Sequence, residues 1–176
     1  STLSTDGRCE IFISGDLERI CDIFIDGNFD NNHQLLLIIR ILRNSCAGSL
    51  ENAKLIGEKN VLKALIVHAK VIAFRDILED DELNVQEVQE GNKEICREVE
   101  SECDRKIILT MCQLLANYPS CGMEPASVLW QSVGLIGLLD ALAAAKKKGS
   151  RAAEGALAAS LYNCIIEEWK NYQATT

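Results

Sequence analysis

The sequence predicts an all-α fold, and two observations carry this prediction. Leu, Ile and Val recur at steps of three and four residues through much of the chain, and no window alternates strictly between apolar and polar residues. The chain has only two prolines, Pro119 and Pro125, and both fall between predicted helical segments. With 176 residues, 48% of them hydrophobic, the chain can bury one core, so we expect a single helical domain over residues 1–176.

Capping residues support the order of the helices. We expect helices at residues 16–26, 33–46, 50–56, 60–78, 93–118, 125–131, 132–147 and 150–172. Ser14 or Asp16 stands at the start of the first helix, Ser49 precedes the third, and Ser150 begins the last. Such side chains accept hydrogen bonds from the free N–H groups of a first helical turn. Gly48 follows the second helix, where a glycine lets the chain turn at the helix end.

Residues 79–102 differ in composition from the rest of the chain. The stretch EDDELNVQEVQEGNKEICREVESE is dense in carboxylates and carries few bulky apolar residues. We expect a long acidic insertion that forms an exposed loop, whose second half can be helical because Ile95 and Val99 are four residues apart. Two roles remain open for this insertion, a solvated segment without a partner or a docking surface for a basic protein.

The charge of the chain argues against two classes of partner. A formal net charge of -8 makes nucleic acid and anionic membrane surfaces unfavourable. We interpret the basic run KKKGSR at residues 146–151 as a solvated turn, with a weak anion-binding or sorting patch as the alternative. No run of eighteen apolar residues occurs, so neither a membrane span nor a signal peptide is expected. The sequence opens with Ser1, which is compatible with a fragment of a longer chain.

The residues that usually perform catalysis or bind metals form no recognisable motif. The eight cysteines lie in helical patterns without a C-x-x-C pair, and we interpret them as reduced core thiols. His33 and His68 lack metal-ligand spacing, and His68 lies in an apolar stretch that indicates a core or groove position. We expect no enzyme activity, no cofactor and no metal. Trp130 and Trp169 are expected in the core, although Trp169 could instead cover an exposed face.

A self-comparison of the sequence reveals a repeat. Leu-x-Asn ends a predicted helix at residues 42–44, 115–117 and 161–163. The spacing of 46 residues between Asn117 and Asn163 fits a three-helix unit of about 40 to 47 residues. The spacing of 73 residues between Asn44 and Asn117 fits the same unit enlarged by the acidic insertion. After the first two copies comes a loop, a short helix and a further apolar helix, so we expect stacked helical repeats.

The residues around the first copy resemble the armadillo repeat. The stretch RILRNSCAGSLENAKLI at residues 40–56 resembles the consensus in which a third helix ends in Leu-x-Asn-x-Ala-x-Gly and Asn52 starts the next helix. Together with CQLLANYPSCGMEPASVLW at residues 112–130, it is similar to the ataxin-10 family. The resemblance covers residues 32–75 and 103–172, and it implies a right-handed α-α superhelix of the armadillo type.

The resemblance also implies where a partner binds. In armadillo arrays the third helices line a concave groove, and asparagine amides hold the backbone of a bound peptide. The candidate partner-binding residues are therefore Arg40, Asn44, Gln113, Asn117 and Asn163. The alternative, that each asparagine braces a neighbouring loop, stays open. Arg40, Gln113 and Ala159 stand where armadillo proteins that carry import signals have Trp, which argues against such a cargo adaptor.

The function implied by the resemblance is that of a non-catalytic scaffold. Proteins similar to the ataxin-10 family work in the cytoplasm through contacts with other proteins, including further copies of themselves, either through the groove or through an end face. An alternative is a regulatory domain that controls a small GTPase or another signalling or cytoskeletal enzyme. The sequence does not separate the two, but only a GTPase regulator must prefer one nucleotide state of its partner.

Overall fold

The computed structural model describes residues 14–27, 29, 31–80 and 90–175, and within these residues it is helical without any strand. The elements are α2 (Asp16–Asp26), α3 (Asn32–Cys46), α4 (Leu50–Glu58), α5 (Val61–Asp80), α6 (Glu90–Asn117), the 3₁₀ helix η1 (Pro119–Cys121), α7 (Met123–Ser132), α8 (Gly134–Lys147) and α9 (Arg151–Thr175). The all-α prediction is confirmed, and each predicted helical segment corresponds to one of the α-helices.

The predicted acidic insertion is helical where the structure describes it. Residues 79–80 end α5 and residues 90–102 begin α6, whereas residues 81–89 lie outside the described part of the chain. The helical second half that the spacing of Ile95 and Val99 allowed is confirmed. Glutamate is a good helix former, and carboxylates near a helix N-terminus interact favourably with the helix dipole. An acidic composition therefore does not prevent residues 90–102 from opening a long helix.

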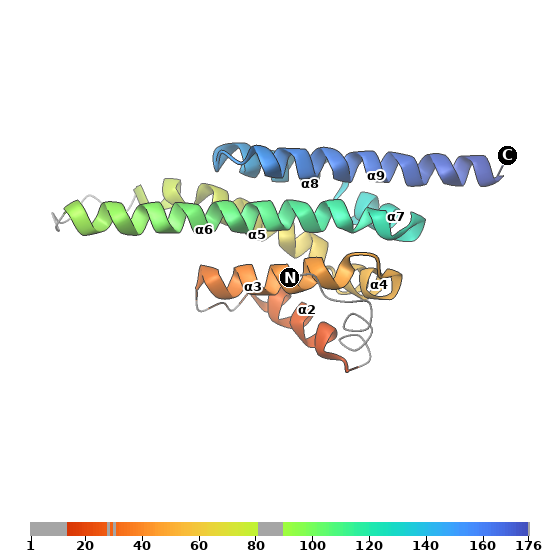
Figure 1. Ribbon diagram of the computed structural model, residues 1–176, viewed down its shortest axis with the longest axis horizontal. Coiled ribbons are helices and arrows are strands. Elements are labelled where there is room, and N and C mark those ends of the chain that lie inside the picture. The colour runs from red at the N-terminus through yellow and green to blue at the C-terminus, as the bar shows by residue number, and fades with distance from the viewer. Residues whose placement is uncertain (1–13, 28, 30, 81–89, 176) are drawn as a thin grey trace.

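The helices stack in layers, with α2, α3 and α4 in the first, α5, α6 and α7 in the second, and α8 and α9 in the third (Figure 1). Helices at equivalent positions in successive layers contact each other, and we call them helices of the same rank. Thus α3 packs on α6 and α6 on α9, α2 packs on α5 and α5 on α8, and α4 packs on α7. In Figure 1, α3, α6 and α9 run in the same direction. The group α4–α5–α6 is therefore arranged like the group α7–α8–α9.

One continuous core lies between the layers. The leucines that end the first two repeat copies, Leu42 and Leu115, are buried, and Ile56 and Leu129 of the short helices are buried with them. Leu161 of the third copy is partly buried against the same core. Burial at equivalent positions follows from the apolar spacing of each helix, since one stripe faces the neighbouring layers.

The backbone of α4 at Gly57 packs closely against the side chain of Tyr118, which follows α6. Tyr118 is fully buried there, and a Cβ atom placed on Gly57 would lie 2.3 Å from its hydroxyl oxygen. Only a residue without a side chain leaves this space for the tyrosine. Gly57 is thus the residue that lets α4 pack against Tyr118.

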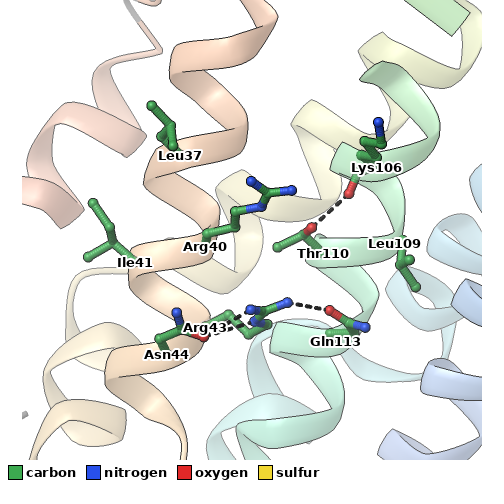
Figure 2. Close-up of a pocket in the computed structure, with 9 residues that line it drawn as sticks. All are labelled: Leu37, Arg40, Ile41, Arg43, Asn44, Lys106, Leu109, Thr110 and Gln113. Atoms are coloured by element: carbon green, nitrogen blue, oxygen red, sulfur yellow. Dashed lines mark hydrogen bonds between the residues drawn. The ribbon is translucent and has the colours of Figure 1, made fainter. Parts of the chain in front are cut away.

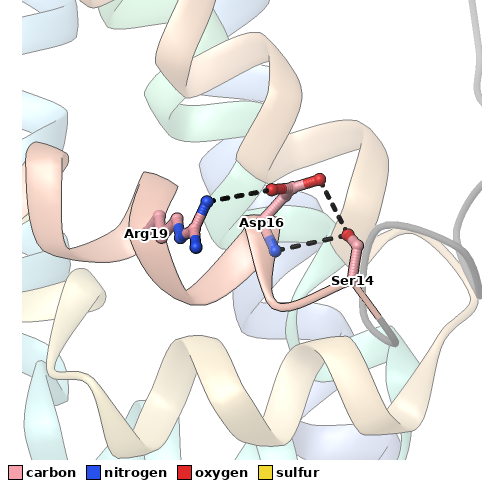
Figure 3. Close-up of polar contacts among 3 residues, drawn as sticks. All are labelled: Ser14, Asp16 and Arg19. Atoms are coloured by element: carbon pink, nitrogen blue, oxygen red, sulfur yellow. Dashed lines mark hydrogen bonds and ion pairs between the residues drawn. The ribbon is translucent and has the colours of Figure 1, made fainter.

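The predicted helix starts agree with the structure at two positions and differ at a third. Ser49 accepts a hydrogen bond from the Asn52 N–H at 3.4 Å, and Ser150 accepts one from the Ala153 N–H at 3.3 Å. At α2 the N-cap position belongs to Gly15. Figure 3 shows Ser14 beside that turn, where its hydroxyl donates to the Asp16 carboxylate at 2.8 Å and accepts from the Asp16 N–H at 3.4 Å.

Two further sequence expectations change in the structure. Pro125 lies in the first turn of α7 rather than between helices, a position where the missing proline N–H breaks no helical hydrogen bond. Trp130 and Trp169 are 50% and 56% exposed, so the expectation of two core tryptophans is wrong. Both lie on helix faces that no other described helix covers fully. Gly48, in contrast, has the left-handed φ of 73° expected at a turn after α3.

Side chains of α9 donate hydrogen bonds to backbone carbonyls at the end of α6. The Leu115 carbonyl lacks its usual donor, because residue 119 is a proline without an N–H. The Ser160 hydroxyl donates to this carbonyl at 2.7 Å. The Asn163 amide donates to the next carbonyl, that of Ala116, at 3.0 Å. Side chains from α9 therefore satisfy two backbone acceptors that α6 leaves open.

A buried ion pair ties three helices together. The Asp104 carboxylate on α6 accepts from the Asn32 amide on α3 at 3.0 Å and from the Lys148 ammonium after α8 at 3.0 Å. The Asp104 and Lys148 side chains are only 3% and 7% exposed. Lys146 and Lys147 are exposed as expected of a solvated turn, but Lys148 is not. The interpretation of KKKGSR is therefore wrong for Lys148, because it is the cation that neutralises Asp104.

The predicted states of the cysteines and of His68 agree with the described structure. The cysteines at positions 21, 46, 103, 112, 121 and 164 are free thiols; Cys9 and the side chain of Cys96 lie outside the described part. His68 packs against Phe24 and Phe29, with ring centroids 5.0 Å and 5.4 Å apart, and its Nε2 lies 3.3 Å from the Phe24 carbonyl oxygen. Burial lowers the pKa of His68, so the neutral imidazole is favoured.

The helices were also compared with the dimensions of a membrane. In the described residues, no individual helix has the length and apolar character needed to cross a bilayer. Helices α7 and α8 reach that length only as a pair, and the pair is bent by 79°.

Candidate functional site: a basic groove between α3 and α6

A pocket of about 650 Å³ lies between α3 and α6. Its walls consist of side chains from these two neighbouring helices of the same rank. The lining residues are Leu37, Arg40, Ile41, Arg43, Asn44, Lys106, Leu109, Thr110 and Gln113. We call this pocket the α3–α6 groove. Its lining combines basic and amide side chains with the apolar side chains of Leu37, Ile41 and Leu109.

Arg43 spans the groove from one helix to the other. Figure 2 shows its guanidinium reaching from α3 to Gln113 on α6, where Nη1 donates to the amide oxygen at 2.5 Å. Its Nε and Nη2 donate to the Asn44 amide oxygen at 3.2 Å and 2.9 Å. Two neutral amides thus fix the position of a charged group without neutralising it. Partial burial and the nearby Arg40 lower the pKa of Arg43, but a guanidinium stays charged at neutral pH.

The groove has an excess of positive charge. Arg40 is exposed and points toward the groove, and no carboxylate in the described part of the chain pairs with it. Lys106 pairs with Glu102 at 3.3 Å, and Glu102 also pairs with Arg105 at 3.3 Å. Arg40, Arg43 and Lys106 therefore line one pocket, and in the described residues only Lys106 among them pairs with a carboxylate, on a chain whose formal net charge is -8. Such a local reversal of sign favours an anionic ligand at this place.

The structure brings together three of the five predicted site residues. Arg40, Asn44 and Gln113 line the α3–α6 groove, whereas Asn117 and Asn163 do not. The three asparagines of the expected ladder therefore do not all line this pocket, and the ladder stays a prediction. The reason is the stagger of the helices, because the side chain that meets Arg43 is Gln113, about one helical turn before Asn117. For Asn163 the bracing role holds, since its amide is bonded to the Ala116 carbonyl.

Sequence reasoning missed the other lining residues, although a signal for them exists. Residues 37, 40, 41 and 44 on α3 have the spacing i, i+3, i+4 and i+7, and residues 106, 109, 110 and 113 on α6 have the same spacing. This spacing defines one face of a helix. This face with its basic and apolar residues predicts Lys106, whereas Arg43 falls outside the spacing and is not predicted by it. The Leu-x-Asn repeat drew attention to the helix ends instead.

The lining side chains of the groove are suited to binding an anion. Its nine lining side chains include no histidine, cysteine or carboxylate that could transfer a proton or attack a substrate. Guanidinium and ammonium groups bind carboxylates and phosphates, and Leu37, Ile41 and Leu109 offer apolar contact beside them. In the described residues, no three potential ligands among His, Cys, Asp and Glu gather around a point where a metal ion could bind.

A second exposed surface lies on α9. Large apolar side chains recur there at steps of three and four residues and form one stripe on the outer face of the last layer. They are Tyr162, Ile165, Trp169 and Tyr172, each more than half exposed. We call this the α9 stripe. It corresponds to an end face of the helical stack and competes with the α3–α6 groove as an interaction surface.

Comparison with protein-family models, with curated proteins and with solved structures finds no match for this chain.

Proposed function

We propose that the chain is a non-catalytic interaction scaffold of the armadillo type whose α3–α6 groove binds an acidic segment of a partner protein. The observation that carries the proposal is the gathering of Arg40, Arg43 and Lys106 around an open groove on an acidic chain. The right-handed superhelix, the likeness to the ataxin-10 family and the cytoplasmic location are parts of this proposal. The Leu-x-Asn repeat and the stacking of helices of equal rank support them.

The geometry of the two arginines explains why a carboxylate is the preferred ligand. A guanidinium presents a planar fork of donors that matches a carboxylate with two hydrogen bonds. Asn44 and Gln113 already hold Arg43 in place, so less conformational freedom is lost when a ligand binds. Arg40 lies one turn earlier on α3 and remains exposed for a second carboxylate. Leu37 is 45% exposed and offers an apolar contact between charged positions.

The overall charge of the chain adds selectivity. A protein with a net charge of -8 repels polyanions at long range, and this repulsion disfavours long nucleic acids more than a short peptide that fits within the groove. The Coulomb attraction inside the groove acts only within a Debye length of about 8 to 10 Å at physiological salt. We therefore expect a short acidic peptide segment, with apolar residues among its carboxylates, to be the natural occupant.

The proposal is tested by fluorescence anisotropy with a fluorescein-labelled oligoglutamate peptide. We expect saturable binding that weakens with added salt, and a loss of about tenfold in affinity for Arg40→Ala and for Arg43→Ala, because each removes a charge-assisted hydrogen bond. Asn44→Ala should weaken binding less, since it only frees the Arg43 guanidinium. An oligolysine peptide of equal length serves as the control ligand.

Matched variants distinguish the groove from other basic sites. Lys147→Ala removes an exposed cation far along the chain and should leave the affinity unchanged. Asn117→Ala tests the ladder expected from the sequence and should also have no effect, because Asn117 does not line the groove. Equal losses in Lys147→Ala and Arg40→Ala, or stronger binding of oligolysine than of oligoglutamate, would refute an acidic ligand in the α3–α6 groove.

A further inference from the structure

Two cysteines from different layers meet at the ends of their helices. Cys46 is the last residue of α3, and Cys121 is the last residue of η1, which follows α6. Their sulfur atoms lie 3.8 Å apart. Cys121 also donates from its thiol to the Cys46 carbonyl oxygen at 3.0 Å. Neither residue lines the α3–α6 groove, so this cysteine pair is a separate feature of the molecule.

The two sulfurs have unequal surroundings. Cys46 is fully buried, whereas Cys121 is only partly buried. The hydrogen bond with the Cys46 thiol lowers the pKa of Cys121. The backbone N–H groups of Gly48 and Ser49 lower it too, whereas burial raises it. The pKa of Cys46 is raised by this same hydrogen bond and by burial. The less buried sulfur is therefore the one that becomes a thiolate first.

The turn after α3 supplies the two N–H groups. Gly48 has a φ of 73°, which a side chain would strain, and Ser49 caps α4. The armadillo-like turn thus places donors beside the sulfur of the neighbouring layer. The Cys46 and Asn117 carbonyls lie near the same sulfur and oppose the negative charge. The net effect still favours the thiolate of Cys121 over that of any other described cysteine with a shifted pKa.

We propose that Cys121 and Cys46 form a peroxide-sensitive dithiol that closes to a disulfide between the first two layers. The Cys121 thiolate attacks hydrogen peroxide, the O–O bond breaks, and protonation of the leaving hydroxide gives water and a sulfenic acid on Cys121. The Cys46 sulfur then attacks the sulfur of Cys121, the S–O bond breaks, and the thiol proton of Cys46 leaves with the hydroxide as water. Two thiols and one peroxide thus yield one disulfide and two waters.

The geometry requires only a local movement for the second step. The sulfurs must approach from 3.8 Å to the bond length of about 2.05 Å. Both cysteines sit at helix ends beside turns rather than within rigid helical segments. The resulting bond would join the end of α3 to η1, two residues beyond Asn44 of the groove. A dithiol reductant reverses it by thiol–disulfide exchange.

The inference is tested on the intact chain by treating it with hydrogen peroxide and analysing it by mass spectrometry. We expect a loss of two hydrogens and, after digestion without reduction, one cross-linked peptide pair that contains Cys46 and Cys121. Dithiothreitol should restore the original mass. In the untreated protein, iodoacetamide should alkylate Cys121 at least about tenfold faster than Cys112 or Cys164, whose pKa values are raised by burial.

Two variants separate the two chemical steps. In Cys46→Ser the sulfenic acid on Cys121 has no partner, so a 1,3-dione probe should label Cys121. Cys112→Ser removes a buried thiol from α6 and should leave disulfide formation unchanged. Cys103 is also partly exposed and serves as the reference for accessibility. Labelling of Cys103 as fast as Cys121, or oxidation of the wild-type chain without a Cys46–Cys121 cross-link, would overturn the proposal.

Discussion

Helix α6 has two neighbours of its own rank, and the two interfaces that it forms are built differently. Toward α9 the contact is closed, and the side chains of Ser160 and Asn163 reach the backbone of α6 itself. Toward α3 the contact opens into a pocket in which Arg43 and Gln113 meet by their side-chain ends. The two interfaces therefore differ in what the neighbouring helix offers to α6: side-chain donors to its backbone from α9, and long charged side chains from α3.

The physical cause lies in the residues that each neighbour presents. Helix α9 buries side chains of small or medium size, among them Ala153, Leu157 and Ser160, and the Ser160 hydroxyl donates to the Leu115 carbonyl of α6. Helix α3 presents Arg40 and Arg43 opposite Lys106, and these like charges cannot be buried against one another without a counterion. The first interface stabilises the fold, and the second keeps charge available for a ligand.

The largest expected effect on stability comes from Asp104 on α6, which bonds to Asn32 on α3 and to Lys148 after α8. Asp104→Ala should lower the free energy of unfolding by about 3 to 5 kcal/mol, because it removes one half of a buried ion pair. Chemical denaturation measures this change. Glu102→Ala, which removes an exposed carboxylate two residues earlier, should change stability by less than about 0.5 kcal/mol. A loss of similar size in both variants would show that Asp104 does not tie the layers.

A smaller loss of stability is expected from a variant of the α6–α9 interface, which is the closed interface. Ser160→Ala should cost about 1 to 3 kcal/mol, because the Leu115 carbonyl then stays buried without a donor. Pro119→Ala restores a backbone N–H at the position from which α6 would normally satisfy this carbonyl. The double variant should therefore lose less stability than the sum of the two single variants. Strict additivity in denaturant melts would exclude this account of the α6 end.

The contact of His68 on α5 with Phe24 on α2 provides a pH-dependent reference that involves neither interface. Burial lowers the pKa of His68 below its ordinary value of 6.5, so the unfolded chain binds this proton more readily than the folded one. The stabilisation is complete above pH 6.5 and declines as the pH falls below it, by at most about 1.4 kcal/mol per pH unit. His68→Gln should flatten this part of the stability profile. An unchanged profile would mean that His68 titrates alike in both states.

The smallest expected effect on stability belongs to the open interface. Arg40→Ala should shift the free energy of unfolding by less than about 0.5 kcal/mol, since the side chain is exposed and has no ion-pair partner in the described structure. The same variant should weaken the binding of oligoglutamate about tenfold. A large loss of stability would show that Arg40 supports the fold rather than a ligand.

The sequence predicts the helices well because their apolar spacing is strong and local. The Leu-x-Asn repeat also predicts which helices share a rank, and the caps at Ser49 and Ser150 are where propensity places them. The groove is harder to predict, because it depends on the stagger between α3 and α6, which brings Gln113 rather than Asn117 to Arg43. The state of Lys148 depends likewise on a contact 44 residues away that no local pattern reveals.

The most direct test of the central claim is a ¹⁵N-labelled NMR titration of the chain with oligoglutamate. If the α3–α6 groove is the binding surface, the amide shifts should concentrate in residues 37–44 and 106–113. Residues 153–163 of the closed interface should change little. Shifts that concentrate instead on the α9 stripe, or that follow the basic residues 146–148, would contradict the account and place the interaction surface outside the groove.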